Sequence, residues 1–357
     1  MDANPLDVVI SQGNRERVLA LLESGSTEFL PEILLLSAAH NQPAIIRDLF
    51  AYHPAFDPNV TTAHGQTALF LAAESGYTEV ITLLLRDPRT DMNRSTEVNY
   101  TPLYAACKRG HLDVVKVLLE DSRVDVNKIG GPHKETPLHA ACRSGQAAII
   151  MEMKREASVN VNARDSTGHT PFYLACFDGE VRAVQILLKD HRIDVNVPGA
   201  LGSPFAAACV RSHHFVIEEL LFDDRVDVNQ LDDSGSTPFA LACRLGNSKV
   251  VRRLVKEWRI DVNRQNHEGA TPLIIAIQAG LIDIVNLILS SGRPVNTQAL
   301  WEGKTALEIA VKDNLVPVVA EIENNASGLS PPFSSSPTCV QNLFTATLCS
   351  LFFHLQT

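Results

Sequence analysis

Thr136-Pro137-Leu138-His139-Ala140-Ala141 is the stretch of sequence that decides the fold, because its core recurs along the chain at a fixed spacing. The copies begin at Thr67, Thr101, Thr136, Thr170, Ser203, Thr237, Thr271 and Thr305. Successive subtraction of these numbers gives steps of 34, 35, 34, 33, 34, 34 and 34 residues. A second marker keeps the same period at Asn59, Asn93, Asn127, Asn162, Asn196, Asn229, Asn263 and Asn296. Two markers in phase indicate an internal structural repeat.

The residues within one repeat predict two short helices followed by a turn. Thr101 is a good N-cap, and Pro102 has the backbone angle that the first helical position needs. Gly110 ends this helix, because glycine readily adopts the left-handed conformation of a C-terminal cap. Residues 112–119 are expected to form a second, amphipathic helix. Residues 124–127 then lead into a polar turn before the next repeat.

This pattern resembles the ankyrin repeat, whose Thr-Pro-Leu-His-x-Ala signature stands nearly intact at residues 136–141. The resemblance covers roughly residues 1–324. It implies an all-α ankyrin-repeat solenoid of about nine helix-turn-helix units with β-hairpin-like fingers, in which each unit packs only on its neighbours. Residues 1–32 are expected to form a capping repeat, residues 33–324 the solenoid, and residues 325–357 a disordered Ser/Pro-rich linker with a short apolar tail.

The end of the second helix departs from the family pattern. The family usually closes this helix with glycine, whereas here Asp121-Ser122-Arg123 and Asp190-His191-Arg192 stand in that place. Only Ser290-Ser291-Gly292 keeps the family form. We therefore expect most of these helices to end with a different local geometry.

Five cysteines share one position in the repeat, six residues after the Thr or Ser. They are Cys107, Cys142, Cys176, Cys209 and Cys243. Ala73, Ile277 and Val311 fill the same position in other repeats, and a position that accepts all these residue types is a buried apolar one. The sequence thus favours core packing over metal binding or redox chemistry. We expect no cofactor and no metal.

The sequence contains no motif that predicts catalysis. Gly303-Lys304-Thr305 ends like a phosphate-binding loop, but Gln298 stands where that loop needs glycine. The pair His213-His214 lacks partners at metal-ligand spacing. We therefore predict a non-enzyme without a small-molecule substrate. The alternative, an active site on the fingers, would need several titratable groups to converge there.

Charge and hydropathy narrow the classes of partner. The formal net charge is −10 and the sequence pI is about 5.6, which disfavours nucleic acid. The first residues lack the apolar core of a secretory signal, and no stretch has the ~20 apolar residues of a membrane span. A cytoplasmic monomer is expected, with the nucleus as an alternative location. The apolar tail leaves open a membrane-tethered adaptor.

The predicted function is protein binding through the concave face and the fingertips, as the resemblance implies. Positions seven and eight residues after the repeat Thr vary in type and carry more cations than anions. The hypothesis is that an acidic, partly apolar segment of a partner protein binds there. The expected contact residues are Tyr104, Lys108, Arg109, His139, Arg143, Tyr173, Phe177, Arg211 and Arg244, with Tyr100 and Trp301 on fingertips. For His139, the resemblance also implies a structural hydrogen bond.

Two further alternatives remain beside the scaffold or adaptor and the membrane-tethered adaptor. These positions are also compatible with ordinary solvated helix surface. A regulator that masks a transcription factor or signalling protein would use the same face. The resemblance further implies that repeat asparagines such as Asn127 or Asn196 are candidates for hydroxylation.

Overall fold

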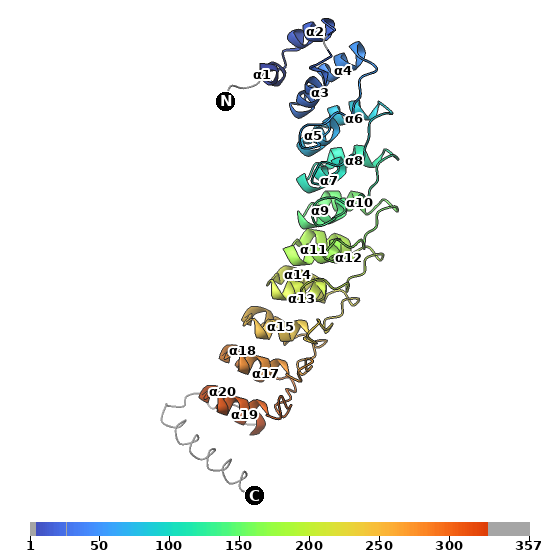
Figure 1. The fold of residues 1–357 in the computed structure, drawn as a ribbon. Coiled ribbons are helices and arrows are strands. Elements are labelled where there is room, and N and C mark those ends of the chain that lie inside the picture. The colour runs from blue at the N-terminus through green and yellow to red at the C-terminus, as the bar shows by residue number, and fades with distance from the viewer. Residues whose placement is uncertain (1–4, 26, 328–357) are drawn as a thin grey trace. The chain divides into compact units, whose positions relative to one another are not determined.

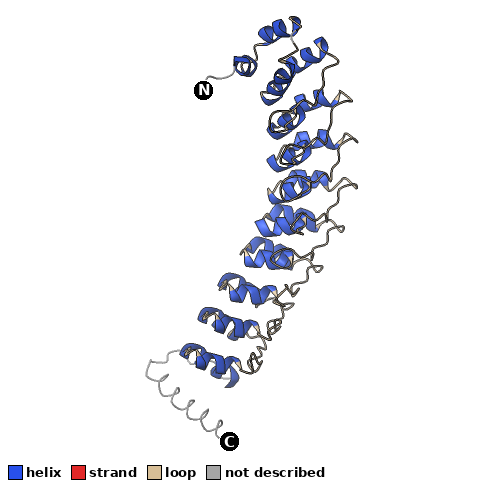
Figure 2. Ribbon diagram, in the orientation of Figure 1, coloured by secondary structure: helices blue, strands red, loops and turns tan. Residues whose placement is uncertain are grey.

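The computed structural model describes residues 5–25 and 27–327, and all regular structure within them is helical (Figures 1 and 2). Twenty helices follow one another as ten pairs in chain order. The all-α solenoid expected from the sequence is thereby confirmed. The described residues hold ten pairs where about nine were expected, and the two N-terminal pairs form without a Thr-Pro signature.

The chain divides into two compact units, Met1–Ala200 and Leu201–Thr357, each described here by itself. Unit 1 contains α1 (Pro5–Ser11), α2 (Arg15–Glu23), α3 (Leu30–Ala39), α4 (Pro43–Tyr52), α5 (Ala68–Ser75), α6 (Thr78–Leu85), α7 (Pro102–Arg109), α8 (Leu112–Leu119), α9 (Pro137–Arg143), α10 (Ala147–Met153), α11 (Pro171–Asp178) and α12 (Val181–Leu188). Unit 2 contains α13 (Pro204–Val210), α14 (His214–Leu221), α15 (Pro238–Arg244), α16 (Ser248–Leu254), α17 (Pro272–Gln278), α18 (Ile282–Leu289), α19 (Ala306–Lys312) and α20 (Val316–Ser327).

Within each unit, the first helix of a pair packs on the first helix of the next pair. Helices α3, α5, α7, α9 and α11 form this stack in unit 1 (Figure 1). Helices α13, α15, α17 and α19 form it in unit 2. The second helices make a parallel stack behind the first. Residues 328–357, which hold most of the predicted linker and tail, lie outside the described residues, so the predicted division into cap, solenoid and tail stays a prediction.

The predicted N-caps are present in every repeat that carries the signature. In each, the Thr or Ser hydroxyl accepts a hydrogen bond from the backbone N–H three residues later, as Thr101 does from Tyr104 at 3.2 Å. Gly110 ends α7 with φ of 87°, in the left-handed region. The predicted start and end of this helix are therefore confirmed.

The five repeat cysteines lie in the core, as the sequence predicted. Each is fully buried with a free thiol. Cys107 Sγ lies 3.6 Å from Met153 Sδ of the following repeat, which is a packing contact between neighbouring pairs. Burial raises the pKa of Cys142 well above the ordinary thiol value, so this thiol stays protonated at neutral pH.

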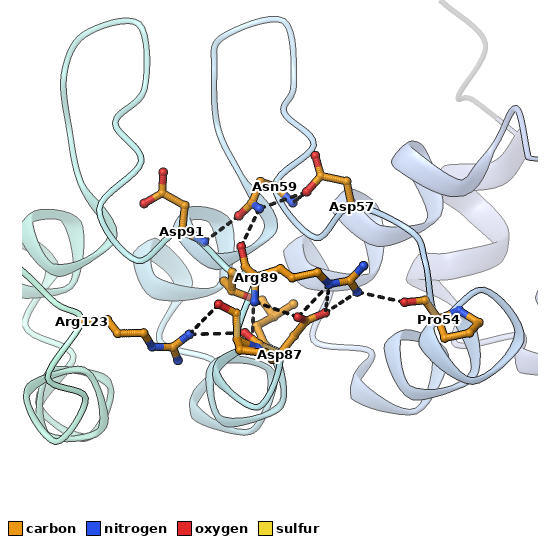
Figure 3. A network of polar contacts seen from close by, with 10 residues as sticks. Pro54, Asp57, Asn59, Asp87, Arg89, Asp91 and Arg123 are labelled. Carbon is orange, nitrogen blue, oxygen red and sulfur yellow. Dashed lines mark hydrogen bonds and ion pairs between the residues drawn. The ribbon is translucent and has the colours of Figure 1, made fainter.

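In unit 1, the unusual Asp-x-Arg sequence links the repeat that carries it to the repeat before it, as Figure 3 shows for Arg89 and Arg123. Asp87 accepts the backbone N–H of Arg89 at 2.9 Å and also pairs with the Arg89 guanidinium at 2.6 Å. The same guanidinium donates to the carbonyl of Pro54 in the preceding repeat at 3.0 Å. Arg123 repeats the arrangement and donates to Leu85 O at 2.9 Å. The arginine thus satisfies carbonyls near the end of the preceding repeat's second helix. We call this arrangement the arginine latch.

The periodic asparagines form a ladder of hydrogen bonds between repeats, beside the arginine latch. Asn59 Nδ2 donates to Arg89 O at 2.9 Å, and Asn59 Oδ1 accepts from Asp91 N at 2.7 Å (Figure 3). One side chain therefore binds the backbone of the next repeat twice. Asn93, Asn127 and Asn162 make the equivalent pair of bonds in unit 1, and Asn229 and Asn263 make it in unit 2.

The fingers between pairs are short hairpin-like turns. Isolated antiparallel bridges join Thr61 to Thr67 and Gly130 to Glu135 in unit 1, and Trp301 to Lys304 in unit 2. No helix among the described residues combines the length and the apolar character needed to cross a bilayer.

Candidate partner-binding surface

Nine residues of unit 1 lie at equivalent repeat positions on α7, α9, α11 and the fingers before them, and their contacts form two sets, one around Glu135 and one around Tyr173. They come from three repeat positions, which lie one residue before, three residues after and seven residues after the capping Thr. We call these nine residues the inner column. Its members are Tyr100, Tyr104, Lys108, Glu135, His139, Arg143, His169, Tyr173 and Phe177.

The α7 part of the inner column is a stack of two rings beneath a cation. The Tyr100 and Tyr104 rings are 4.8 Å apart with an interplanar angle of 13°. Lys108 Nζ lies 5.1 Å from the centroid of the Tyr100 ring, a distance at which ring and ammonium attract. Lys108 is exposed, Tyr100 is half-buried and Tyr104 is buried.

The α9 part is built around a buried carboxylate. Glu135 Oε2 accepts the hydroxyl of Tyr104 at 2.7 Å, and Glu135 Oε1 lies 2.7 Å from Arg143 Nη2. Burial, together with this carboxylate, raises the pKa of Tyr104. Arg143 extends from Glu135 to the surface, where 42% of its side chain is exposed. The hydrogen bond between Tyr104 and Glu135 joins two repeats, because Tyr104 belongs to the repeat before that of Glu135.

The α11 part is an aromatic stack. The His169 and Tyr173 rings are 4.5 Å apart and nearly parallel, at 6°. Tyr173 and Phe177 follow at 6.1 Å and 23°. His169 Nε2 accepts the backbone N–H of Ala200 at 3.1 Å, which fixes the ring against the next finger. Phe177 is half-buried at the outer end of the stack.

Several predicted contact residues lie deeper than the sequence suggested. Tyr104, His139 and Tyr173 are buried, at 3%, 0% and 0% exposure, and form a floor beneath the surface. The reason is their position three residues into the helix, where the side chain packs against the next finger. The expectation that these three side chains face a partner directly is therefore corrected.

The predicted fingertip residues do not stand at the tips of the fingers. Tyr100 is the last residue before the capping Thr, and its ring stacks back on α7. Trp301 is half-buried in unit 2, where its backbone forms the bridge to Lys304. A role for Trp301 in partner binding stays a prediction.

The positive charge of this surface is smaller than the sequence count suggested. Arg109 pairs with Glu74 at 2.9 Å, and Arg143 pairs with Glu135. Glu135 adds a negative charge outside the positions seven and eight residues after the repeat Thr, because it lies in the finger and not in the helix. Arg211 and Arg244 are exposed in unit 2, at the ends of α13 and α15.

A pocket opens between α7 and α9 within the inner column. Its volume is about 210 Å³. Its lining includes Tyr100, Tyr104, Lys108, Pro132, Glu135 and Arg143. Two cations and one carboxylate therefore share one small cavity. Sequence spacing alone did not indicate it, because its lining comes from two repeats and the finger between them.

Unit 2 exposes three large aromatic side chains that the sequence analysis did not single out. Phe215, Phe222 and Trp258 are 77%, 84% and 81% exposed. They belong to the second helix of a pair or to the turn after it, away from the first helices and fingers that carry the predicted contact residues. The sequence does indicate these residues, because each aromatic side chain interrupts the polar face expected on the outer side of a second helix. Among the residues that the structure describes, no three His, Cys, Asp or Glu side chains group as metal ligands.

Comparisons with known proteins agree with this architecture. No match is found among curated protein sequences. The crystal structure of the ankyrin repeat domain of Bcl-3, which its title calls a unique member of the IkappaB protein family, superposes with a TM-score of 0.56 at 22% identity, covering 63% of this chain and 98% of that one. A family model of ankyrin repeats in three copies matches residues 34–130, 124–198 and 204–299. The chain therefore belongs to the ankyrin-repeat family.

Proposed function

We propose that the chain is a non-enzymatic scaffold or adaptor that binds a segment of a partner protein along the inner column. The observation that carries the proposal is the layering of this surface. Tyr104, His139 and Tyr173 form a fixed floor, and Lys108 and Arg143 stand exposed above it. A rigid floor holds the exposed groups in place before a partner arrives, which lowers the entropic cost of binding.

The residue types of the inner column support protein binding. Aromatic and arginine side chains are enriched among the residues that contribute most to protein interfaces. Phe177 and Tyr100 are half-buried, so each offers part of an aromatic ring to a partner. Proteins of the ankyrin-repeat family typically bind other proteins. The likeness to Bcl-3 concerns the fold and assigns no partner to this chain.

Selection of peptides on the purified chain tests the proposal. Peptides of about twelve residues, which reach ~40 Å when extended, are displayed and selected for binding. Selected peptides are then measured against a column variant that carries Lys108→Glu and Phe177→Asp. We expect a loss of affinity of about tenfold or more, which corresponds to ~1.4 kcal/mol.

A matched control places the same types of change on the second helices. The control variant carries Lys116→Glu and Met151→Asp, both at exposed positions, on α8 and α10. It should bind the selected peptides as the unaltered chain does. Equal affinity of the column variant and the unaltered chain would show that binding takes place elsewhere.

A further inference from the structure

The pocket between α7 and α9 has an excess of positive charge. Lys108 and Arg143 line it together with a single carboxylate, Glu135. One oxygen of that carboxylate accepts the Tyr104 hydroxyl, and the other forms an ion pair with Arg143 at 2.7 Å. The Glu135 side chain is only 6% exposed, so it acts as a support under Arg143 and is shielded from a ligand.

The two cations are held in place by their neighbours. Arg143 is fixed by Glu135, which is fixed in turn by the Tyr104 hydroxyl of the preceding repeat. Lys108 lies over the Tyr100 ring, and that ring stacks on Tyr104. Within the described residues, Arg143 has no second ion pair and Lys108 has none. Most of the Arg143 N–H donors therefore remain available to a ligand.

The size of the pocket limits what it can hold. Its volume of about 210 Å³ lies below the ~300–1,000 Å³ of typical small-molecule sites. It suits a single side chain. Two cations side by side attract an anion, and a guanidinium matches the geometry of a carboxylate.

We propose that this pocket binds the side-chain carboxylate of a glutamate or aspartate in the partner segment. This inference rests on the proposed function and specifies the partner's chemistry. Arg143 donates N–H groups to the carboxylate, and Lys108 adds a second positive charge. The Tyr100 ring and Pro132 flank the methylene groups of the bound residue.

The inner column also sets the distance to a second contact. Stacked helices are ~8–10 Å apart and an extended chain rises ~3.3 Å per residue. Phe177 lies on α11, one helix beyond α9. An apolar residue of the partner therefore reaches Phe177 when it stands about three to five residues from the acidic one.

Three peptide libraries test the proposal on the full chain. Each contains peptides of about twelve residues with one central position fixed as Glu, Gln or phosphoserine and the others varied. We expect the Glu library to yield binders. Replacing that Glu by Gln in a recovered peptide should then weaken binding by about tenfold or more, and the loss should shrink as salt is raised from about 50 to 200 mM.

Variants of the pocket residues test whether the preference for Glu over Gln arises in this pocket. With Lys108→Gln, the preference for Glu over Gln in the peptide should fall, because the pocket loses one of its two positive charges. This variant should fold normally, since Lys108 is exposed and its removal leaves no buried charge unpaired. Arg143→Gln should lower the preference further, provided that its circular dichroism and melting match the unaltered chain. Arg109→Gln is the control, since Arg109 neighbours Lys108 in sequence but does not line the pocket.

The outcomes separate the two proposals. A peptide that depends on the inner column but binds equally with Glu or Gln would overturn the carboxylate pocket and leave the scaffold proposal standing. A phosphoserine peptide that binds where its Glu counterpart does not would also overturn it, in favour of a phosphoryl group. Full retention of the Glu preference in Lys108→Gln and Arg143→Gln would place the acid-binding site elsewhere.

Discussion

At the scale of single residues, His139 shows how the repeat signature holds its own fold together. Its Nδ1 accepts the backbone N–H of Thr136 at 3.1 Å, and its Nε2–H donates to His169 O in the next finger at 3.0 Å. These contacts define a neutral ring. Burial lowers the pKa of His139 below the ordinary value of 6.5. Protonation would place a second proton on Nδ1, where the ring must accept the Thr136 N–H.

Mild acid should therefore destabilise the chain through His139. Because the folded-state pKa lies below the unfolded value, the unfolded chain takes up the proton first, and stability is lost as the pH falls through that unfolded value. We expect the urea midpoint to fall between about pH 7 and pH 5.5, and to fall less in His139→Gln. His191→Gln, at an exposed position, should behave as the unaltered chain does. An equal fall of the urea midpoint in His139→Gln and His191→Gln would show that His139 is not the source of the acid sensitivity.

The sequence predicted single residues well where their partners are close in the chain. The caps of Thr101 and Thr136 were predictable because donor and acceptor are three residues apart. The burial of Tyr104 was not, because its hydroxyl partner Glu135 lies 31 residues away in the next repeat. Whether a residue at this position faces solvent depends on the neighbouring finger, and spacing within one repeat carries no information on that.

At the scale of elements, the arginine latch explains how the second helices end without glycine. Arg123 donates to the carbonyls of Leu85 and Pro88 at 2.9 and 3.3 Å. Its pairing with Asp121 lowers the pKa of that carboxyl, chiefly through their hydrogen bond. The sequence showed that a different ending was needed. Its form was not predictable, because the bonded carbonyls lie some 35 and 38 residues earlier.

Removal of one latch should weaken the joint between two repeats. Arg123→Ala leaves the carbonyls of Leu85, Asp87 and Pro88 without this donor, and we expect a loss of about 1–3 kcal/mol in the free energy of unfolding. Equilibrium urea unfolding measures it. Lys116→Ala, at an exposed position on α8, should stay within about 0.5 kcal/mol of the unaltered chain. An Arg123→Ala variant with the same free energy of unfolding as this control would show that water satisfies the carbonyls as well as the arginine does.

At the scale of the whole molecule, stability should vary from pair to pair, because each pair is held only by its neighbours. The N-terminal end differs from the middle of unit 1 in burial. One residue of the seven in α1 is buried, whereas six of the seven in α9 are buried. The period in the sequence predicted the repetition, and the weak signature at the N-terminus was consistent with a less tightly packed end.

Amide hydrogen exchange should reveal this gradient. We expect the amides of α1 and α2 to exchange about tenfold faster or more than those of α9, because opening a terminal pair breaks one interface and opening an inner pair breaks two. Mass spectrometry of peptic fragments separates these helices. Uniform exchange from α1 to α9 would mean that unit 1 opens in a single cooperative step.

The asparagine ladder has a consequence for how such a chain acquires new specificities. Asn59, Asn93 and Asn127 join successive repeats through backbone atoms, so the joints do not depend on which side chains the repeats carry elsewhere. Positions such as Lys108 can then change freely while the register between repeats is preserved. Selection for a new ligand and selection for a stable scaffold therefore act on separate sets of residues.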